Sequence, residues 1–129
     1  MNFILDTDIV ISYFNRNEPT VVLVEDMLQK ATTVAISTLT ITEVRTGWTQ
    51  EKAAMYMPKL YDLFTLEPVT QEIAELAGVW RHDYHSKGKP LSTPDTIIAA
   101  TAHLRAFSLV TKNTKDYPMP ELKLYDREA

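Results

Sequence analysis

Short apolar runs alternate along this chain with amphipathic helical segments, and this alternation limits it to very few folds. The runs are too short for helices and are rich in the residues that buried strands favour. They lie at Phe3–Leu5, Val34–Ser37, Leu63–Leu66, Phe107–Thr111 and Leu122–Tyr125. Strands that alternate with helices predict an α/β fold, with a mostly parallel five-stranded sheet flanked by helices on both faces.

Helical patterns fill the segments between the expected strands. The sequence Thr40-Ile41-Thr42-Glu43 has the form of a capping box and predicts a helix start. In Ser92-Thr93-Pro94-Asp95 we expect a hydroxyl cap, a proline at the first helical position and an acid in the first turn. With no repeat or linker, residues 1–129 are expected to form a single domain.

Composition excludes several kinds of chemistry. The chain contains no cysteine, which rules out disulfides, thiolate metal sites and cysteine nucleophiles. Asp6 comes too early for a signal peptide, and no apolar run reaches bilayer length, so a cytoplasmic protein without a membrane segment is expected. The net charge of −4 argues against tight nonspecific binding of nucleic acid. Cations bound by clustered carboxylates would reverse the local charge, so a metallonuclease stays compatible with it.

Four acids follow the expected strands at one edge of the sheet. Asp6 ends the first strand, Glu43 follows the second, and Asp116 follows the Phe107–Thr111 strand. Asp95 opens a helix that runs back to the start of that strand, so it joins the same edge. Carboxylates that converge there would repel one another unless cations neutralised them. Oxygen ligands without cysteine or a histidine cluster indicate Mg²⁺ or Mn²⁺ rather than zinc.

Each acid also has an ordinary structural interpretation. Glu43 completes a capping box, and Asp95 suits a helix dipole. Asp8 is better interpreted as a helix N-cap than as a ligand. Asp116 fits a turn before Tyr117-Pro118. Any one of these interpretations is sufficient alone, but together they leave the convergence at one edge unexplained.

Four blocks of the sequence together resemble a PIN domain, and most closely the VapC-type toxins of bacterial type II toxin–antitoxin pairs. They span nearly the whole chain, in order: Phe3-Ile4-Leu5-Asp6-Thr7-Asp8, Ser37-Thr38-Leu39-Thr40-Ile41-Thr42-Glu43-Val44, Pro94-Asp95-Thr96-Ile97-Ile98-Ala99-Ala100-Thr101-Ala102 and Leu109-Val110-Thr111-Lys112-Asn113-Thr114-Lys115-Asp116-Tyr117.

The resemblance implies a metal-dependent endoribonuclease. Asp6, Glu43 and Asp95 match the best-defined metal-binding acids, and either Asp116 or Asn113 fills the fourth position. Bound Mg²⁺ or Mn²⁺ would activate a water that hydrolyses an RNA phosphodiester, with a tRNA-like substrate as one possibility. The resemblance also implies a homodimer and a VapB-like antitoxin that occludes the active site.

Polar and basic residues near the last block are candidates for substrate binding. Thr111 and Asn113 are expected to hydrogen-bond either the acids or the scissile phosphate, and Lys112 and Lys115 to contact phosphates. Weaker phosphate candidates are Arg16, Arg45, Arg81, Lys87 and Lys89. His82 and His85 are interpreted as surface residues. The large side chains of Trp48, Met55, Tyr56 and Trp80 are interpreted as core rather than interface.

Two other functions stay open. Asp6-Thr7-Asp8-Ile9-Val10 fits the nucleophile motif of haloacid-dehalogenase-type phosphatases, with Asp6 attacking phosphorus and Asp8 as general acid. That family also needs paired acids after a later strand, whereas Asp95 follows a segment that is not a strand. The second alternative is a non-catalytic PIN-like interaction module, which the retained acids argue against.

Overall fold

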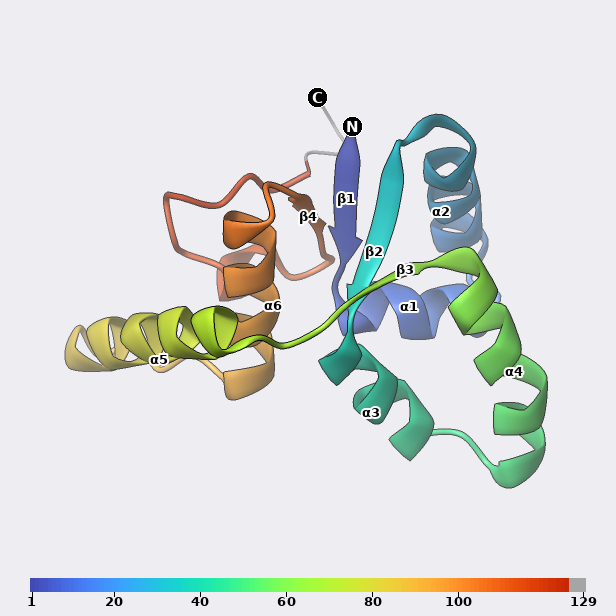
Figure 1. Cartoon of the computed structure of the whole chain (residues 1–129), viewed down its shortest axis with the longest axis horizontal. Coiled ribbons are helices and arrows are strands. Elements are labelled where there is room, and N and C mark those ends of the chain that lie inside the picture. The colour runs from blue at the N-terminus through green and yellow to red at the C-terminus, as the bar shows by residue number, and fades with distance from the viewer. Residues whose placement is uncertain (126–129) are drawn as a thin grey trace.

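The fold is built on a parallel sheet of four strands, seen in a computed structural model that describes residues 1–125. The strands are β1 Asn2–Leu5, β2 Thr33–Ser37, β3 Thr65–Glu67 and β4 Ser108–Val110. Their order is β3-β2-β1-β4, and every neighbouring pair is parallel (Figure 1). The predicted α/β class is confirmed, and the carboxyl ends of all these strands lie at one edge.

The predicted fifth strand, Leu122–Tyr125, is wrong. This segment makes a single parallel bridge, between Leu109 and Leu124. The Leu109 amide donates to Lys123 O at 2.9 Å, and the Tyr125 amide donates to Leu109 O at 2.8 Å. Because successive backbone groups of a strand point to opposite edges, the short β4 offers only the groups of Leu109 on this side. The two hydrogen bonds of this single residue form an isolated bridge and not a paired strand.

Six α-helices and one 3₁₀ turn connect the strands in residues 1–125. The helices are α1 Thr7–Phe14, α2 Glu18–Lys30, α3 Thr38–Thr46, α4 Gln50–Leu63, α5 Gln71–Ser86 and α6 Thr93–Leu104, and the 3₁₀ turn is Thr114–Asp116. The predicted cap at Ser92 is confirmed, but Pro94 is the second helical residue, not the first.

Helix α3 starts earlier than the capping-box prediction placed it. Ser37, the last residue of β2, caps the helix by accepting a hydrogen bond from the Leu39 amide at 3.1 Å. Helix α3 therefore begins at Thr38, directly after the strand, and Glu43 lies within it. The first backbone amides of a helix are the ones without an intrahelical partner, and the cap at Ser37 lies next to them. Thr40 and Glu43 lie further along the helix, where no unpaired amide is left for a capping box.

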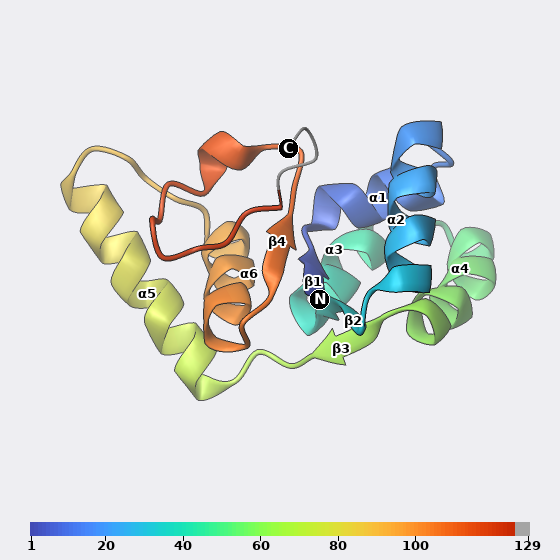
Figure 2. The same ribbon diagram turned by 90° about the horizontal axis from the view of Figure 1, so that it is seen from above.

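Alternate side chains of the strands supply two separate cores. Phe3 and Leu5 pack with α1, α2, α3 and α4 on one face of the sheet. Ile4, between them in sequence, packs with α5 and α6 on the other face. This alternation is the period of two that strands impose. Figure 2 shows the resulting three layers, with α5 and α6 on one side of the sheet and the other helices opposite.

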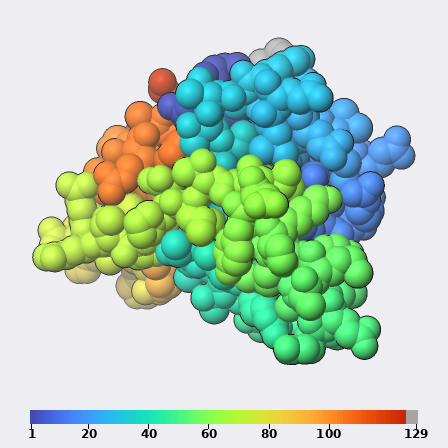
Figure 3. All heavy atoms as spheres, turned by 45° about the vertical axis from the view of Figure 1, so that its right-hand side comes forward, coloured from blue at the N-terminus to red at the C-terminus, as the bar shows by residue number. Residues whose placement is uncertain are grey.

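Helix α4 covers the outer part of the first core, and its own outer surface is exposed. In Figure 3 it lies with β3 in the green part of the surface, next to α2 in blue. Tyr56 of this helix packs against Phe14 and Trp48, as predicted for core aromatics, and Trp80 of α5 is buried. Met55 is 68% exposed, so its predicted place in the core is wrong. Its neighbour Tyr56 takes the inward direction on this helix.

In the described part of the chain, residues 1–125, every helix is too short or too polar to cross a membrane.

Candidate functional site

Asp6 lies at the centre of the candidate site, at the end of the inner strand β1. It caps α1, and its Oδ1 accepts a hydrogen bond from the Thr7 amide at 2.8 Å. Its Oδ2 accepts from the hydroxyls of Thr111 and Tyr117, each at 2.8 Å. The side chain is only 6% exposed. A buried carboxylate with three donors is fixed in orientation, and its charge has no cationic partner among them.

Asp95 reaches the same place from the first turn of α6. The Tyr117 hydroxyl lies 3.2 Å from its Oδ1 and so connects it to Asp6. Burial raises the pKa of Asp95, its hydrogen bond with Ser92 opposes that effect, and the charges of Asp6 and Asp116 raise it further. Asp95 is therefore at the carboxyl edge of the sheet, as its helix direction predicted.

Glu43 joins this group through Thr7. The Thr7 hydroxyl donates to Glu43 Oε1 and lies 3.0 Å from the Thr40 hydroxyl. Because α3 begins at Thr38, Glu43 is a half-buried residue of its second turn rather than a capping residue. Because its carboxylate does not cap the helix, it is available to the acid group.

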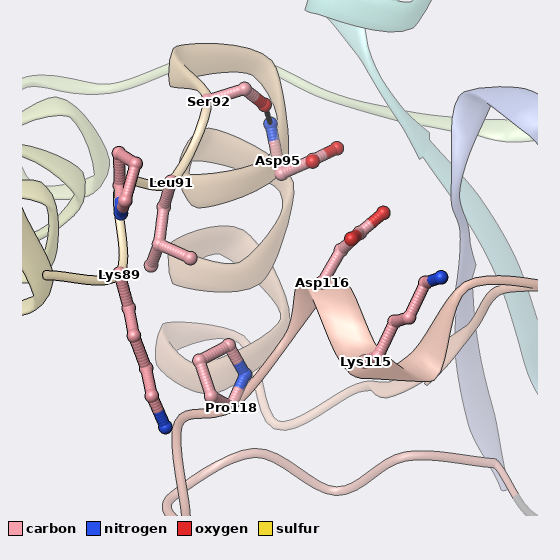
Figure 4. A pocket seen from close by; sticks show the side chains of 8 residues that line it. Lys89, Leu91, Ser92, Asp95, Lys115, Asp116 and Pro118 are labelled. Carbon is pink, nitrogen blue, oxygen red and sulfur yellow. Dashed lines mark hydrogen bonds between the residues drawn. The ribbon is translucent and has the colours of Figure 1, made fainter.

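Asp116 lies opposite Asp95 across a hollow of about 260 Å³. Figure 4 shows the two carboxylates pointing to the same side, with the Lys115 ammonium beyond them. The Lys89 side chain also lines this hollow but points away from the acids. The structure thus brings Asp116, and not Asn113, next to Asp95.

The remaining predicted substrate residues divide into two groups. Thr111 is buried and donates to Asp6, which matches the expectation that it hydrogen-bonds the acids. The Asn113 side-chain amide donates to Asp8 Oδ2 at 3.0 Å. Lys112 donates to the Ser12 hydroxyl at 2.7 Å. Only Lys115 of the two predicted lysines lines the hollow.

Tyr117 is the site residue that sequence reasoning missed, because Tyr117-Pro118 was interpreted as part of a turn. Its ring is buried at 3% exposure, and its hydroxyl contacts two acids. Burial and the charges of Asp6 and Asp95 raise its pKa, so the hydroxyl keeps its proton. A buried tyrosine hydroxyl requires a hydrogen-bond partner. The presence of Tyr117 directly after Asp116 could therefore have indicated that its hydroxyl contacts the acids.

The donor set fits a hard divalent cation. The ion pairs of residues 1–125 are Lys30–Asp26 and Arg105–Glu67, so none of them neutralises Asp6, Asp95 or Asp116. No three acids or histidines in that range lie close enough to enclose an ion by themselves. Mg²⁺ is usually held by one or two carboxylates, with water and substrate phosphate completing its shell. Asp6, Asp95 and Asp116 provide oxygen ligands of that type.

Asp8 lies beside this group, in the first turn of α1. Asp6 is the N-cap, so the prediction that Asp8 caps the helix is wrong. The Oδ1 atom of Asp8 is buried without a hydrogen bond. Burial, with a smaller effect of the Asp6 charge, raises the pKa of Asp8 to about 6, although nearby amides and Lys112 lower it.

Replacing Asp8 by asparagine is expected to stabilise the metal-free protein at neutral pH. Because its pKa rises from 3.8 to about 6 on folding, the folded state binds more protons between these values. Wild-type stability therefore falls as the pH rises through this window. Asp8→Asn should gain about 1 kcal/mol at pH 7, after allowing for partial exposure, and almost nothing near pH 4. Urea unfolding in EDTA at several pH values measures this, and equal stability at pH 7 would contradict it.

These features define a PIN domain: the family model for the PIN domain matches residues 3–119, and the chain belongs to this family. Among curated proteins it is similar to ribonuclease VapC19 of Mycobacterium tuberculosis, with 26% identity over 93% of this chain and 96% of the relative. Its structure is similar to a toxin–antitoxin complex from Klebsiella pneumoniae, with 29% identity, a TM-score of 0.75, and coverage of 93% and 94% of the two chains.

Another solved structure with this fold is DNA-bound VapBC from Salmonella typhimurium. It has 21% identity, a TM-score of 0.84, and coverage of 98% of both chains.

Proposed function

We propose that this protein is an endoribonuclease that requires Mg²⁺ or Mn²⁺, and that it is the toxin of a type II toxin–antitoxin pair. The observation that carries the proposal is the joining of Asp6, Glu43 and Asp95 at one sheet edge, through Thr7 and Tyr117. No ion pair of residues 1–125 neutralises these acids. The similarity to ribonuclease VapC19 supports RNA as the substrate.

The residues have distinct roles in this proposal. Asp6 and Asp95 would hold the cation, and Asp116 would supply a further oxygen ligand from across the hollow. Glu43, fixed by the Thr7 hydroxyl, would orient the attacking water and accept its proton. A bound divalent cation would lower the pKa of that water and neutralise charge on the phosphoryl oxygens. Hydrolysis by water leaves a 5′-phosphate and a 3′-hydroxyl.

Two hollows side by side offer a path for the RNA strand. Pro90 and Leu91 line both the hollow at Asp95 and a second one of about 300 Å³. Arg81, His82 and His85 of α5 line the second hollow. Arg81 donates through Nε to Leu91 O at 2.9 Å, which fixes the guanidinium at the second hollow and leaves its terminal amino groups for another acceptor. We place an RNA phosphate at Arg81, one of the basic residues singled out from the sequence.

Arg81→Ala is expected to weaken binding of single-stranded RNA about fivefold, the effect of losing one phosphate contact of about 1 kcal/mol. The slope of log affinity against log salt should fall by about 0.7. Fluorescence anisotropy in EDTA measures both without cleavage. Lys52→Ala, an exposed cation in the first turn of α4, is the control and should bind like wild type. An unchanged salt slope in Arg81→Ala would remove Arg81 from the RNA path.

The proposed partners are a VapB-like antitoxin and a second copy of the chain. The solved relatives include toxin–antitoxin complexes, which supports a partner chain that occludes the acids. We expect the antitoxin to place a cationic side chain there, because the acid group has a charge that the described ion pairs do not neutralise.

The phosphatase alternative requires Asp6 as a nucleophile, and the structure disfavours this. Asp6 is 6% exposed, both acceptor positions of Oδ2 are used by Thr111 and Tyr117, and Oδ1, which accepts from the Thr7 amide, keeps only one position for a ligand. Membership of the PIN family also argues against it. The non-catalytic module differs from our proposal only in activity, so a cleavage assay separates the two.

Metal removal tests the proposed function. Protein stripped of metal and separated from any antitoxin is incubated with total tRNA and a synthetic RNA in EDTA, Mg²⁺ or Mn²⁺. We expect no cleavage in EDTA and cleavage with 5′-phosphate ends once either cation is added. Cleavage in EDTA with 2′,3′-cyclic phosphate ends would indicate a contaminating ribonuclease. Absence of cleavage under every condition would favour the non-catalytic module.

A further inference from the structure

The hydroxyl of Tyr117 lies between two acids that come from distant parts of the chain. Asp6 follows β1, and Asp95 is in the first turn of α6. The Tyr117 oxygen is 2.8 Å from Asp6 Oδ2 and 3.2 Å from Asp95 Oδ1. The ring is held in the core between the sheet and α6, so the hydroxyl has a fixed position. Tyr117 therefore connects the two carboxylates through one rigid group.

The hydrogen bonds leave acceptor positions on both carboxylates for another ligand. Asp6 Oδ2 accepts from both Thr111 and Tyr117, so its two acceptor positions are occupied. Asp6 Oδ1 accepts from the Thr7 amide and keeps one position. Tyr117 contacts Asp95 through Oδ1, which leaves Oδ2. Asp6 is thus held through both of its oxygens and keeps one acceptor position on Oδ1, whereas the bond from Tyr117 to Asp95 leaves Oδ2 of that carboxylate.

A single hydroxyl cannot satisfy both acids. It carries one hydrogen, which it donates to one carboxylate at a time, and the shorter contact identifies Asp6 as the main acceptor. The bond to Asp95 is the longer of the two, and this carboxylate also faces the nearby charges of Asp6 and Asp116. A cation at the remaining acceptor positions would relieve this repulsion.

We infer that Tyr117 is a positioning residue, whose hydroxyl orients Asp6 and Asp95 so that their remaining acceptor positions face a single divalent cation, and which thereby sets the affinity for that cation. The inference rests on the proposed function. Groups that hydrogen-bond metal ligands fix ligand orientation, and their removal typically lowers metal affinity about 10- to 100-fold. Tyr117 orients two ligands at once, so its removal should change the affinity for the cation more than the rate of the chemical step.

Tyr117→Phe tests the inference because it removes the hydroxyl and keeps the buried ring. Binding of Mn²⁺ to metal-stripped protein is followed by the electron paramagnetic resonance signal of the free ion. We expect the dissociation constant for Mn²⁺ to rise about 10-fold. The Mg²⁺ concentration for half-maximal RNA cleavage should rise by a similar factor, while kcat at saturating Mg²⁺ changes little. A role in folding alone would not move the Mn²⁺ affinity of the folded protein.

Tyr84→Phe is the matched control. It also removes a tyrosine hydroxyl, one that lies 3.3 Å from Pro118 O, and the variant should bind Mn²⁺ like wild type. Thr111→Val removes the other hydroxyl that donates to Asp6 Oδ2 and should weaken Mn²⁺ binding as well. Circular dichroism and thermal unfolding verify that each variant is folded before titration.

The outcomes separate the inference from the proposed function. If wild type binds Mn²⁺ and cleaves RNA but Tyr117→Phe has the same Mn²⁺ affinity, the role of Tyr117 is overturned and the ribonuclease stands. If wild type neither binds Mn²⁺ nor cleaves RNA, the proposed function fails, and the inference fails with it. A 10-fold loss of affinity in Tyr117→Phe that Tyr84→Phe does not share would establish the role.

Discussion

Asp95→Asn is expected to reduce RNA cleavage about 1000-fold, because it replaces a charged cation ligand by a neutral amide of the same shape. Metal stabilisation of phosphoryl charge is worth several kcal/mol, and each 1.36 kcal/mol corresponds to a factor of ten in rate. The backbone amide of Asp95 keeps its bond to the Ser92 hydroxyl, so the start of α6 is unaffected. Initial rates on a synthetic RNA at saturating Mg²⁺ measure the loss.

The same substitution should not destabilise the protein. Asp95 is near Asp6 and Asp116, whose charges raise its pKa, so removing its charge relieves repulsion at neutral pH. The melting temperature of metal-free Asp95→Asn should equal or exceed that of wild type. Asp62→Asn, an exposed position on α4, is the control for the chemical change and should keep full activity. If Asp95→Asn cleaves like wild type, Asp95 is not a ligand.

Trp80→Ala is expected to lower the free energy of unfolding by about 3–5 kcal/mol, through loss of buried area and the cavity left behind. Trp80 is 5% exposed, packs in the core between α5 and α6, and lies 5.9 Å from the His103 ring between centroids. Because this pair of helices carries both hollows, the variant should also lose RNA binding. Urea unfolding monitored by far-ultraviolet circular dichroism measures the change.

Val79→Ala, next to Trp80 on the same helix, provides the comparison. Val79 is 49% exposed, so shortening it should change stability by less than about 0.5 kcal/mol. Because alanine has a higher helix propensity than either residue, a similar loss in both variants would mean that the stability does not depend specifically on the contact of Trp80 with α6.

The sequence was most informative where one local signal determines the structure. The runs at Phe3–Leu5 and Val34–Ser37 predicted strands β1 and β2 to within one residue, because a short and mostly apolar run is typical of a buried strand. Ser92 predicted the start of α6, because its hydroxyl accepts a hydrogen bond from the Asp95 amide, which has no partner within the helix. These signals depend only on neighbours along the chain.

Prediction failed where distant segments decide the outcome. Whether Leu122–Tyr125 forms a strand depends on how many backbone groups the short β4 presents, which no local pattern records. The Thr40–Glu43 capping box placed the start of α3 too late, because the actual cap at Ser37 depends on where β2 ends. Tyr117 was missed because its partners, Asp6 and Asp95, lie far away in the sequence. The general location of the acids was predictable, but not the group that connects them.

The place of β1 inside the sheet has a consequence for protein synthesis. Asp6 leaves the ribosome well before its partners Thr111 and Tyr117, which lie more than 100 residues later in the chain. Strand β4, which pairs with β1, also comes late. A nascent chain therefore cannot assemble the acid group until the segment through Tyr117 has been synthesised, and a chain that terminates before β4 never does. Any activity that depends on this group is thus confined to chains that have been synthesised past Tyr117.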